Sequence, residues 1–382
     1  MTAPLDVDRL IADPGTRIIV CCGAGGVGKT TTAAAIALRA AEQGRDVCVL
    51  TIDPARRLAQ SMGLSQLDNI PRLVQDIRAE DGRGSLSAMM LDMKRTFDEV
   101  VESHSDPERA QAILDNPFYQ ALSSSFAGTQ EYMAMEKLGQ LRAQADRDGT
   151  WDLIVVDTPP SRSALDFLDA PERLGSFLDG RFIRILTAPA RGAGRGLGKL
   201  LGAGFGIFAG VLTKILGAQL LSDLAAFIGA VDTMFGGFRE RADATYALLK
   251  DRGTAFIVVA APEADALREA AYFVERLEED GMPLSGLVLN RVQIVRAPEL
   301  SMEMALAGAA RLEAEGAEPL TAALLRLHAD RQRNSARQER LADGFRVAHP
   351  SVPVAWVPTL AEDVHDLEGL REVGGLLAEQ GR

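Results

Sequence analysis

The feature that most constrains the fold is a glycine-rich stretch near the start of the chain. Residues 23–30 read GAGGVGKT and fit the pattern G-x-x-x-x-G-K-[ST] of a phosphate-binding loop. The apolar run 17–22 before it predicts a buried strand, and the alanine-rich run 30–43 after it predicts a helix that stops at Gly44. Strand, loop and helix in this order indicate an α/β sheet with a phosphate ligand at the loop.

The residue types in this loop suit a triphosphate and a magnesium ion. Its glycines let backbone N–H groups turn toward phosphates, and the helix N-terminus adds a positive partial charge. Lys29 supplies a cation, and Thr30 supplies a hydroxyl for Mg²⁺. We therefore expect ATP and Mg²⁺ as cofactors. The residues assigned to nucleotide binding here are Gly23, Ala24, Gly25, Gly26, Val27, Gly28, Lys29, Thr30 and Thr31.

Two aspartates follow apolar runs and are candidates for the same site. Asp53 follows the run 46–52, and Asp157 follows the run 153–156 ahead of a Thr-Pro-Pro turn. A carboxylate at the C-terminal end of a parallel strand faces the ligand crevice of such a sheet. We expect Asp157 to hold Mg²⁺ or its water. The alternative for either aspartate is a helix cap, for Asp53 on a helix that begins at Pro54.

Charge and cysteine content narrow the class of protein. The net charge of −12 argues against nucleic acid as a partner, because affinity for DNA or RNA comes from Lys and Arg that neutralise phosphates. Cys21, Cys22 and Cys48 all fall in predicted strands, which offers neither a disulfide framework nor a zinc site. The first residues carry acid and no apolar core of a secretory signal. We expect a cytoplasmic protein.

The pattern along the chain predicts a sheet-forming core and a helical insert. Further apolar strand patterns occur at 86–93, 255–260, 284–290 and 352–357, whereas residues 94–148 are charged and helix-periodic. The expected fold class is α/β, with a doubly wound, mostly parallel sheet of the P-loop NTPase type and an inserted α-helical subdomain. We assign residues 1–93, 149–175 and 251–382 to the core, and residues 94–148 and 176–250 to the insert.

Residues 180–222 differ from the rest of the chain. They hold six basic and no acidic residues, with apolar residues spaced mostly three or four apart. The apolar interval 200–213 is shorter than the ~20 residues needed to cross a bilayer. Two interpretations stay open: a glycine-rich loop packed into the insert, or a surface for a membrane protein or hydrophobic client. The second would allow peripheral attachment at the inner face of a membrane.

With the loop, the run Asp53-Pro54-Ala55 and the run 157–160 in place, the chain resembles the ArsA-type ATPases nearly end to end. These are the anion-pump ATPase subunits and the tail-anchored-protein targeting ATPases. The resemblance implies that Asp53 opens switch I and acts on the attacking water, and that Asp157 opens switch II. Asp53 and Lys29 are then the catalytic residues, and Asp53 joins Thr30 and Asp157 at the metal.

The resemblance also assigns the adenine side and the partner sites. It implies adenine-side loops at Asn290-Arg291 and from Pro358 to Gly369, and a client or effector site on the helical insert. Ala24 stands where the family carries a signature lysine that reaches across a dimer to the partner's nucleotide. The expected assembly is therefore a homodimer, or a heterodimer with a lysine-bearing paralogue.

The leading hypothesis is a Mg²⁺-dependent ATPase whose nucleotide state opens and closes a dimer. Hydrolysis would be coupled to an anion, a hydrophobic client or a membrane partner bound at the insert. One alternative is a MinD- or ParA-like positioning ATPase, which the acidic C-terminal segment 364–382 disfavours. The other is a nucleotide-binding regulatory subunit with low turnover in a heteromeric ATPase, which Ala24 favours.

Overall fold

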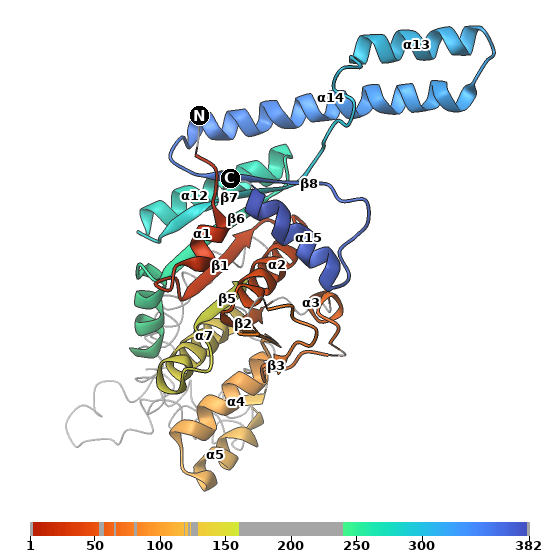
Figure 1. Cartoon of the computed structure of the whole chain (residues 1–382). Coiled ribbons are helices and arrows are strands. Elements are labelled where there is room, and N and C mark those ends of the chain that lie inside the picture. Colours follow the sequence, from red (N-terminus) through yellow and green to blue (C-terminus); the bar gives the residue numbers. More distant parts are fainter. Residues whose placement is uncertain are drawn as a thin grey trace, which may run out of the picture. The chain divides into compact units, whose positions relative to one another are not determined.

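The computed structural model describes residues 3–52, 57–64, 66–79, 82–117, 119–120, 123, 129–159 and 240–379. Contacts divide the chain into two compact units. The first comprises residues 1–90, 144–164 and 248–382 and holds the sheet, and the second comprises residues 91–143 and 165–247 (Figure 1). Asp53 and the segment 180–222 lie outside the described residues, so their predicted roles stay predictions.

The described strands form one eight-stranded sheet in the order β3-β4-β2-β5-β1-β6-β7-β8. All neighbours are parallel except β3, which pairs antiparallel with β4 at one edge. This confirms the predicted α/β class with a mostly parallel sheet. The strands are β1 Ile18–Gly23, β2 Asp46–Thr51, β3 Arg72–Leu73, β4 Ser85–Met90, β5 Leu153–Asp157, β6 Thr254–Ala260, β7 Leu284–Val292 and β8 Val354–Pro358.

The central strands are buried on both faces, which is why they read as continuous apolar runs rather than alternating ones. Every residue of β1, β5 and β6 is buried. In the parallel register, Cys21 of β1 and Thr51 of β2 both lie beside Asp157 of β5. The C-terminal ends of these three neighbouring strands therefore lie together, where the glycine-rich loop begins.

Helix α2 (Lys29–Glu42) follows the loop and is mostly buried, which its many alanines allow. It packs on α15 (Leu367–Ala378), and Figure 1 shows the two side by side. An ideal Cβ on Gly374 would lie 3.4 Å from the Ala35 carbonyl oxygen, which is ordinary van der Waals contact between the two helices. The other described helices of this unit are α1 Val7–Ala12, α3 Arg57–Ser61, α12 Ala264–Glu279, α13 Met302–Ala314 and α14 Pro319–Ala348.

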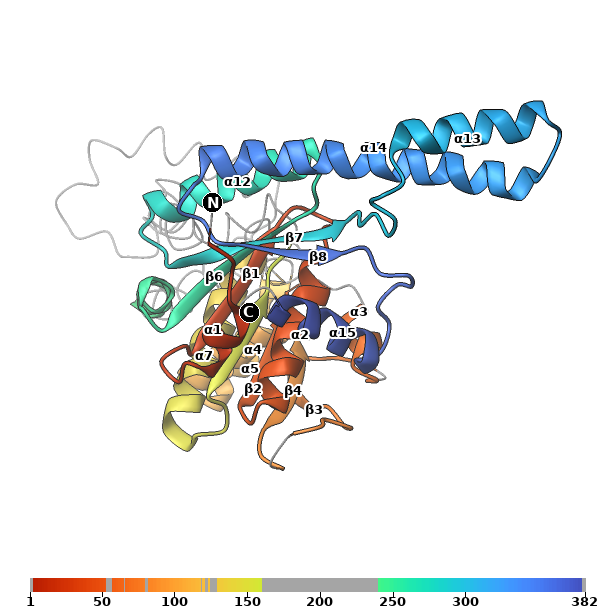
Figure 2. The same ribbon diagram turned by 45° about the horizontal axis from the view of Figure 1, so that its top comes forward.

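Helices α13 and α14 form a hairpin. Figure 2, like Figure 1, shows α13 and the half of α14 that packs on it extending away from the sheet. The seam between the two helices is made of small buried residues, which lets the backbones approach closely: Ala305, Ala309, Ala322 and Ala329. At the start of the hairpin, the Gln332 amide and His328 Nε2 each lie 2.7 Å from the Leu300 carbonyl oxygen.

The described part of the second unit is helical. It includes α4 Met93–His104, α5 Pro107–Leu114, α7 Thr129–Asp148, whose last residues belong to the first unit, and the helical residues 240–247. Phe97 packs edge-on against Tyr119 with ring centroids 5.4 Å apart, and the Tyr119 hydroxyl donates to Asp98. Buried Lys137 pairs with Glu99 at 2.9 Å. Among the described helices, none combines the length and apolar character needed to cross a bilayer.

Two local features differ from the sequence prediction. The strand expected over 86–93 ends at Met90, because Asp92 accepts a hydrogen bond from the Arg95 N–H and caps α4. The edge strand β3 was not predicted. It has two residues, both exposed, and so carries no apolar periodicity.

Candidate nucleotide-binding site

The glycine pattern of the loop follows from how closely other backbone and side-chain atoms approach it. Gly23 has φ +143°, and a Cβ there would lie 2.1 Å from the Val259 carbonyl oxygen of β6. Gly28 has φ +97° and precedes α2, and a Cβ there would lie 2.1 Å from Asn290 Nδ2. Both positions therefore exclude a side chain for conformational and steric reasons.

Lys29 begins α2 with its side chain folded back over the loop. The residue is 6% exposed, and its ammonium donates to the Ala24 carbonyl oxygen at 2.8 Å. Gly25 and Gly26, between these two residues, are exposed. The arrangement places a cation and a helix N-terminus beside open backbone, which is the environment that anionic phosphates require.

Asp157 lies at the centre of a buried cluster of oxygen atoms. Its Oδ2 accepts hydrogen bonds from the hydroxyls of Thr30 at 2.7 Å and Thr51 at 2.8 Å. Asp157 is fully buried, and these donors offset part of the cost of removing its carboxylate from water. Hydroxyl and carboxylate oxygens are the ligands that Mg²⁺ prefers, so the donor set fits this ion.

Asn290 ties the loop to the neighbouring end of β7. Its amide nitrogen donates to the Val27 carbonyl oxygen at 2.8 Å, and its Oδ1 accepts from the Arg291 N–H at 2.9 Å. Pro358, the other predicted adenine-side residue, ends β8 next to Val292 of β7. Asn290 therefore supports the loop directly, whereas the adenine-side roles of both residues stay predictions.

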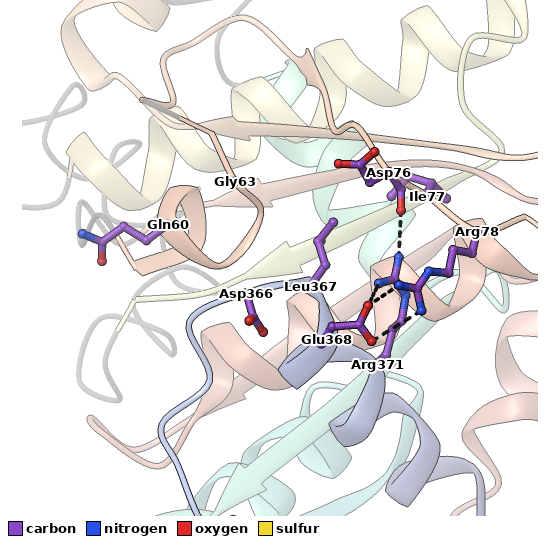
Figure 3. Close-up of a pocket in the computed structure, with 9 residues that line it drawn as sticks. All are labelled: Gln60, Gly63, Asp76, Ile77, Arg78, Asp366, Leu367, Glu368 and Arg371. Carbon is purple, nitrogen blue, oxygen red and sulfur yellow. Dashed lines mark hydrogen bonds and ion pairs between the residues drawn. The ribbon is translucent and has the colours of Figure 1, made fainter.

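The far end of the predicted adenine-side segment lines a separate cavity of about 560 Å³ (Figure 3). Arg78 and Arg371 both pair with Glu368 there, and Arg371 also pairs with Glu42 at 2.8 Å. The Asp76 carbonyl oxygen accepts a further hydrogen bond from Arg371 at 2.8 Å. Because carboxylates of the same region already neutralise both arginines, this cavity offers little net positive charge for a phosphate.

Two thiols lie directly behind the loop. Burial raises the pKa of Cys22 to about 12, with the positive charge of Lys29 acting in the opposite direction. Burial also raises the pKa of Cys21 well above its usual value, and the negative charge of Asp157 adds to that shift. Both thiols therefore stay protonated near neutral pH, and they suit packing rather than metal binding or nucleophilic chemistry.

The structure brings Lys29, Thr30, Asp157 and Asn290 together around the loop. Sequence reasoning missed Thr51, which shares the Asp157 carboxylate with Thr30. It also missed Thr158, whose hydroxyl donates to the Cys21 carbonyl oxygen at 2.9 Å and holds the end of β5 against β1. The sequence signal available for Thr51 was a hydroxyl residue near the end of the apolar run 46–52.

Comparison with known proteins identifies the class to which this fold and loop belong. A family model described as Anion-transporting ATPase matches residues 16–304. The chain therefore belongs to the ArsA family of anion-transporting ATPases, and the prediction of an ATP-binding ATPase of this family is confirmed. The match ends at residue 304, before all of α14 and most of α13.

Three individual relatives are 25–28% identical to this chain. ATPase GET3 of Malassezia globosa is 25% identical over 290 residues, which cover 76% of each chain. ATPase GET3 of Podospora anserina is 25% identical over 279 residues, which cover 72% of this chain and 73% of that protein. A putative arsenical pump-driving ATPase of Halobacterium salinarum is 28% identical over 197 residues, which cover 48% of this chain and 28% of that protein.

Proposed function

We propose that this protein hydrolyses ATP at the glycine-rich loop in the presence of Mg²⁺, and that its nucleotide state opens and closes a dimer. The observation that carries the proposal is the cluster in which the Thr30 hydroxyl meets Asp157 Oδ2 at 2.7 Å, one residue from the buried cation of Lys29. The proposed phosphate-binding loop and the proposed metal site, whose ligands are all oxygen atoms, thus lie together at the C-terminal ends of the strands.

Each residue has a distinct task in this proposal. Lys29 leaves the Ala24 carbonyl and donates to the phosphates, together with the backbone N–H groups of the loop. Thr30 and Asp157 hold Mg²⁺, which neutralises negative charge on the phosphates when it is bound. Asp53 orients the attacking water and takes its proton. Phosphoryl transfer to water needs positioning and charge stabilisation more than covalent chemistry, so this set is sufficient.

The helical unit is the proposed place of coupling to a partner. The partner is an anion, a hydrophobic client or a membrane protein, and the segment 180–222 supplies basic and apolar contacts to it. Similarity to ATPase GET3 proteins and to an arsenical pump-driving ATPase supports a targeting or pumping role. The proposed location is the cytoplasm, with peripheral attachment at the inner face of a membrane.

Two substitutions separate binding from hydrolysis. Lys29→Ala removes the cation of the loop and should abolish ATP binding, whereas Asp53→Asn should bind ATP and hydrolyse it slowly. The measurements are fluorescent-ATP binding and steady-state phosphate release, with Lys250→Ala as the matched control on an exposed lysine. Full turnover by Asp53→Asn would show that Asp53 is a helix cap rather than the group that activates water.

A regulatory subunit with low turnover is the second candidate, and Ala24 favours it. In relatives with a lysine at this position, the side chain reaches the opposite nucleotide, and a cation supplied in trans can raise phosphoryl transfer by ~10³ or more. We expect slow turnover of the isolated chain and faster turnover of Ala24→Lys. Fast wild-type turnover that survives the double change Arg56→Ala and Arg57→Ala would exclude this candidate.

A further inference from the structure

The α13–α14 hairpin carries an apolar surface that the fold does not use. Leu320, Leu324 and Leu327 follow one another at spacings of four and three along α14, which places them on one face of the helix. They are 72%, 55% and 47% exposed. We call these three residues the leucine stripe. The neighbouring face of α14 already packs on α13 through Ala322 and Ala329, so the stripe remains available for another contact.

Charge is distributed unequally on the two sides of the leucine stripe. Three acidic residues precede it, and two of them are paired within the chain: Glu313 with Arg326, and Glu315 with Arg311. The third is Glu318. The helix beyond it carries Arg331, Arg333, Arg337 and Arg340, of which Arg333 pairs with Asp330 at 3.0 Å. Among the described residues, the side chains of Glu318 and Arg331 make no hydrogen bond or ion pair. Glu318 and Arg331 are both exposed, so each can pair with a group from another molecule.

We propose that the leucine stripe binds the leucine stripe of a second copy of this chain, with the two α14 helices antiparallel. A two-fold contact requires a self-complementary surface, in which residue i of one copy meets residue j of the other and the reverse. A two-fold axis beside Leu324 places Glu318 of one copy opposite Arg331 of the other, and it does so twice. A parallel arrangement would set Glu318 against Glu318 and Arg331 against Arg331.

The order of acid, leucine and arginine favours a second copy over an apolar client. Glu318 lies six positions before Leu324 and Arg331 lies seven positions after it, which corresponds to roughly 9 Å and 10 Å along a helix. In the antiparallel arrangement, Glu318 of one copy therefore reaches the level of Arg331 of the other when the Leu324 side chains meet. A contact surface as small as the leucine stripe gives a weak, reversible dimer rather than an obligate one. The contact involves no residue of the nucleotide site and goes beyond the ATP-gated dimer proposed above.

The first test measures self-association of the full chain without nucleotide, by sedimentation velocity over a range of concentrations. Leu324→Ser removes the central contact and should raise the dimer dissociation constant by roughly tenfold or more. Val347→Ser, on an exposed apolar residue near the other end of the same helix, is the matched control and should leave it unchanged. Circular dichroism melts should coincide for all three proteins, since the changed side chains are exposed.

The second test uses charge reversal. Glu318→Arg and Arg331→Glu should each weaken the dimer, because each homodimer then contains two like-charge pairs. An equimolar mixture of the two variants should form a heterodimer, because both of its pairs are again of opposite charge. A wild-type chain that stays monomeric would overturn the proposal, as would a dimer indifferent to Leu324→Ser or a mixture no better than its components. ATP turnover by Leu324→Ser tests the proposed ATPase activity separately, because that activity does not need the stripe.

Discussion

The loop end of the sheet and the tip of the α13–α14 hairpin use burial in opposite ways. At the loop, Lys29 and Asp157 are charged and yet buried, and each has hydrogen-bond partners at fixed distances. At the tip, the leucine stripe is apolar and yet exposed. A buried charge is stable only where the surrounding groups compensate it, whereas an exposed leucine costs the fold little.

The two regions differ in how well their residues should tolerate substitution. At the loop, backbone conformation, glycine positions and side-chain donors must all be correct at once, because several atoms already lie in contact there. At the tip, the hairpin folds through its alanine seam, and the exposed residues are left to determine association. Substitutions at the loop should therefore impair folding or nucleotide binding, and substitutions at the tip should impair neither.

The largest expected effect is on folding, from Gly23→Ala. The added methyl group would meet the Val259 carbonyl oxygen at 2.1 Å, in a backbone conformation with φ +143°. We expect destabilisation of about 3 kcal/mol or more, measured as a loss of thermal stability. Gly375→Ala is the control, since no atom lies within 4 Å of its added Cβ and alanine favours the helix. Equal melting temperatures for the two variants would show that the Gly23 backbone tolerates a side chain.

The next effect compares a leucine in each region. Leu50 is fully buried in β2, so Leu50→Ala should lower the free energy of unfolding by about 2–5 kcal/mol. Leu324→Ala removes the same atoms from an exposed position and should change it by less than ~0.5 kcal/mol. Chemical denaturation of both variants measures the difference. Similar losses of unfolding free energy would mean that Leu324 already packs against other residues of its own chain.

A smaller effect is expected on nucleotide affinity from Asn290→Ala. This change removes the hydrogen bond to the Val27 carbonyl oxygen and loosens the loop without altering its sequence. One hydrogen bond of about 1.4 kcal/mol corresponds to roughly a tenfold rise in the dissociation constant for ATP. Isothermal titration calorimetry measures it, with Asn334→Ala on exposed α14 as the control. An unchanged affinity would remove Asn290 from the site.

The last effect concerns the thiols behind the loop and appears only at alkaline pH. Because burial raises the pKa of Cys22 to about 12, its thiol remains protonated in the folded protein after an unfolded thiol has ionised. The free energy of unfolding should therefore be constant below the ordinary thiol pKa of about 8.5 and should fall as the pH rises toward 12. Cys22→Ser should flatten this decline. Alkylation at pH 8 should be slow in the native protein and fast in denaturant, and rapid native labelling would contradict the assigned burial.

The strands of the core could be predicted from the sequence because they are buried on both faces. The runs before the loop and before Asp157 are uninterrupted and apolar, and a parallel central strand requires such a run. The edge strand β3 and the exact end of β4 could not be predicted, since one is exposed and the other is set by the Asp92 cap. An exposed two-residue strand and a single capping residue give a weaker sequence pattern than a buried strand does.

Part of the candidate site could also be predicted, for a similar reason. Lys29 and Thr30 belong to a contiguous motif, and Asp157 follows a strong strand pattern. Thr51 could not be found in this way, because its role depends on strand register between β2 and β5, which the sequence does not state. The leucine stripe could not be predicted either, because its exposure depends on which face of α14 packs against α13.

The Mg²⁺ dependence of ATP hydrolysis in Thr30→Ala tests the proposed metal site most directly. The Thr30 hydroxyl lies 2.7 Å from Asp157 Oδ2, and the two groups together form the proposed metal site. Removing one oxygen should raise the Mg²⁺ concentration for half-maximal phosphate release by roughly 10–100-fold or more. Thr321→Ala, which changes an exposed threonine at the hairpin tip, should match the wild type. An identical Mg²⁺ dependence for Thr30→Ala and the wild type would contradict the assignment of this cluster as the metal site of the ATPase.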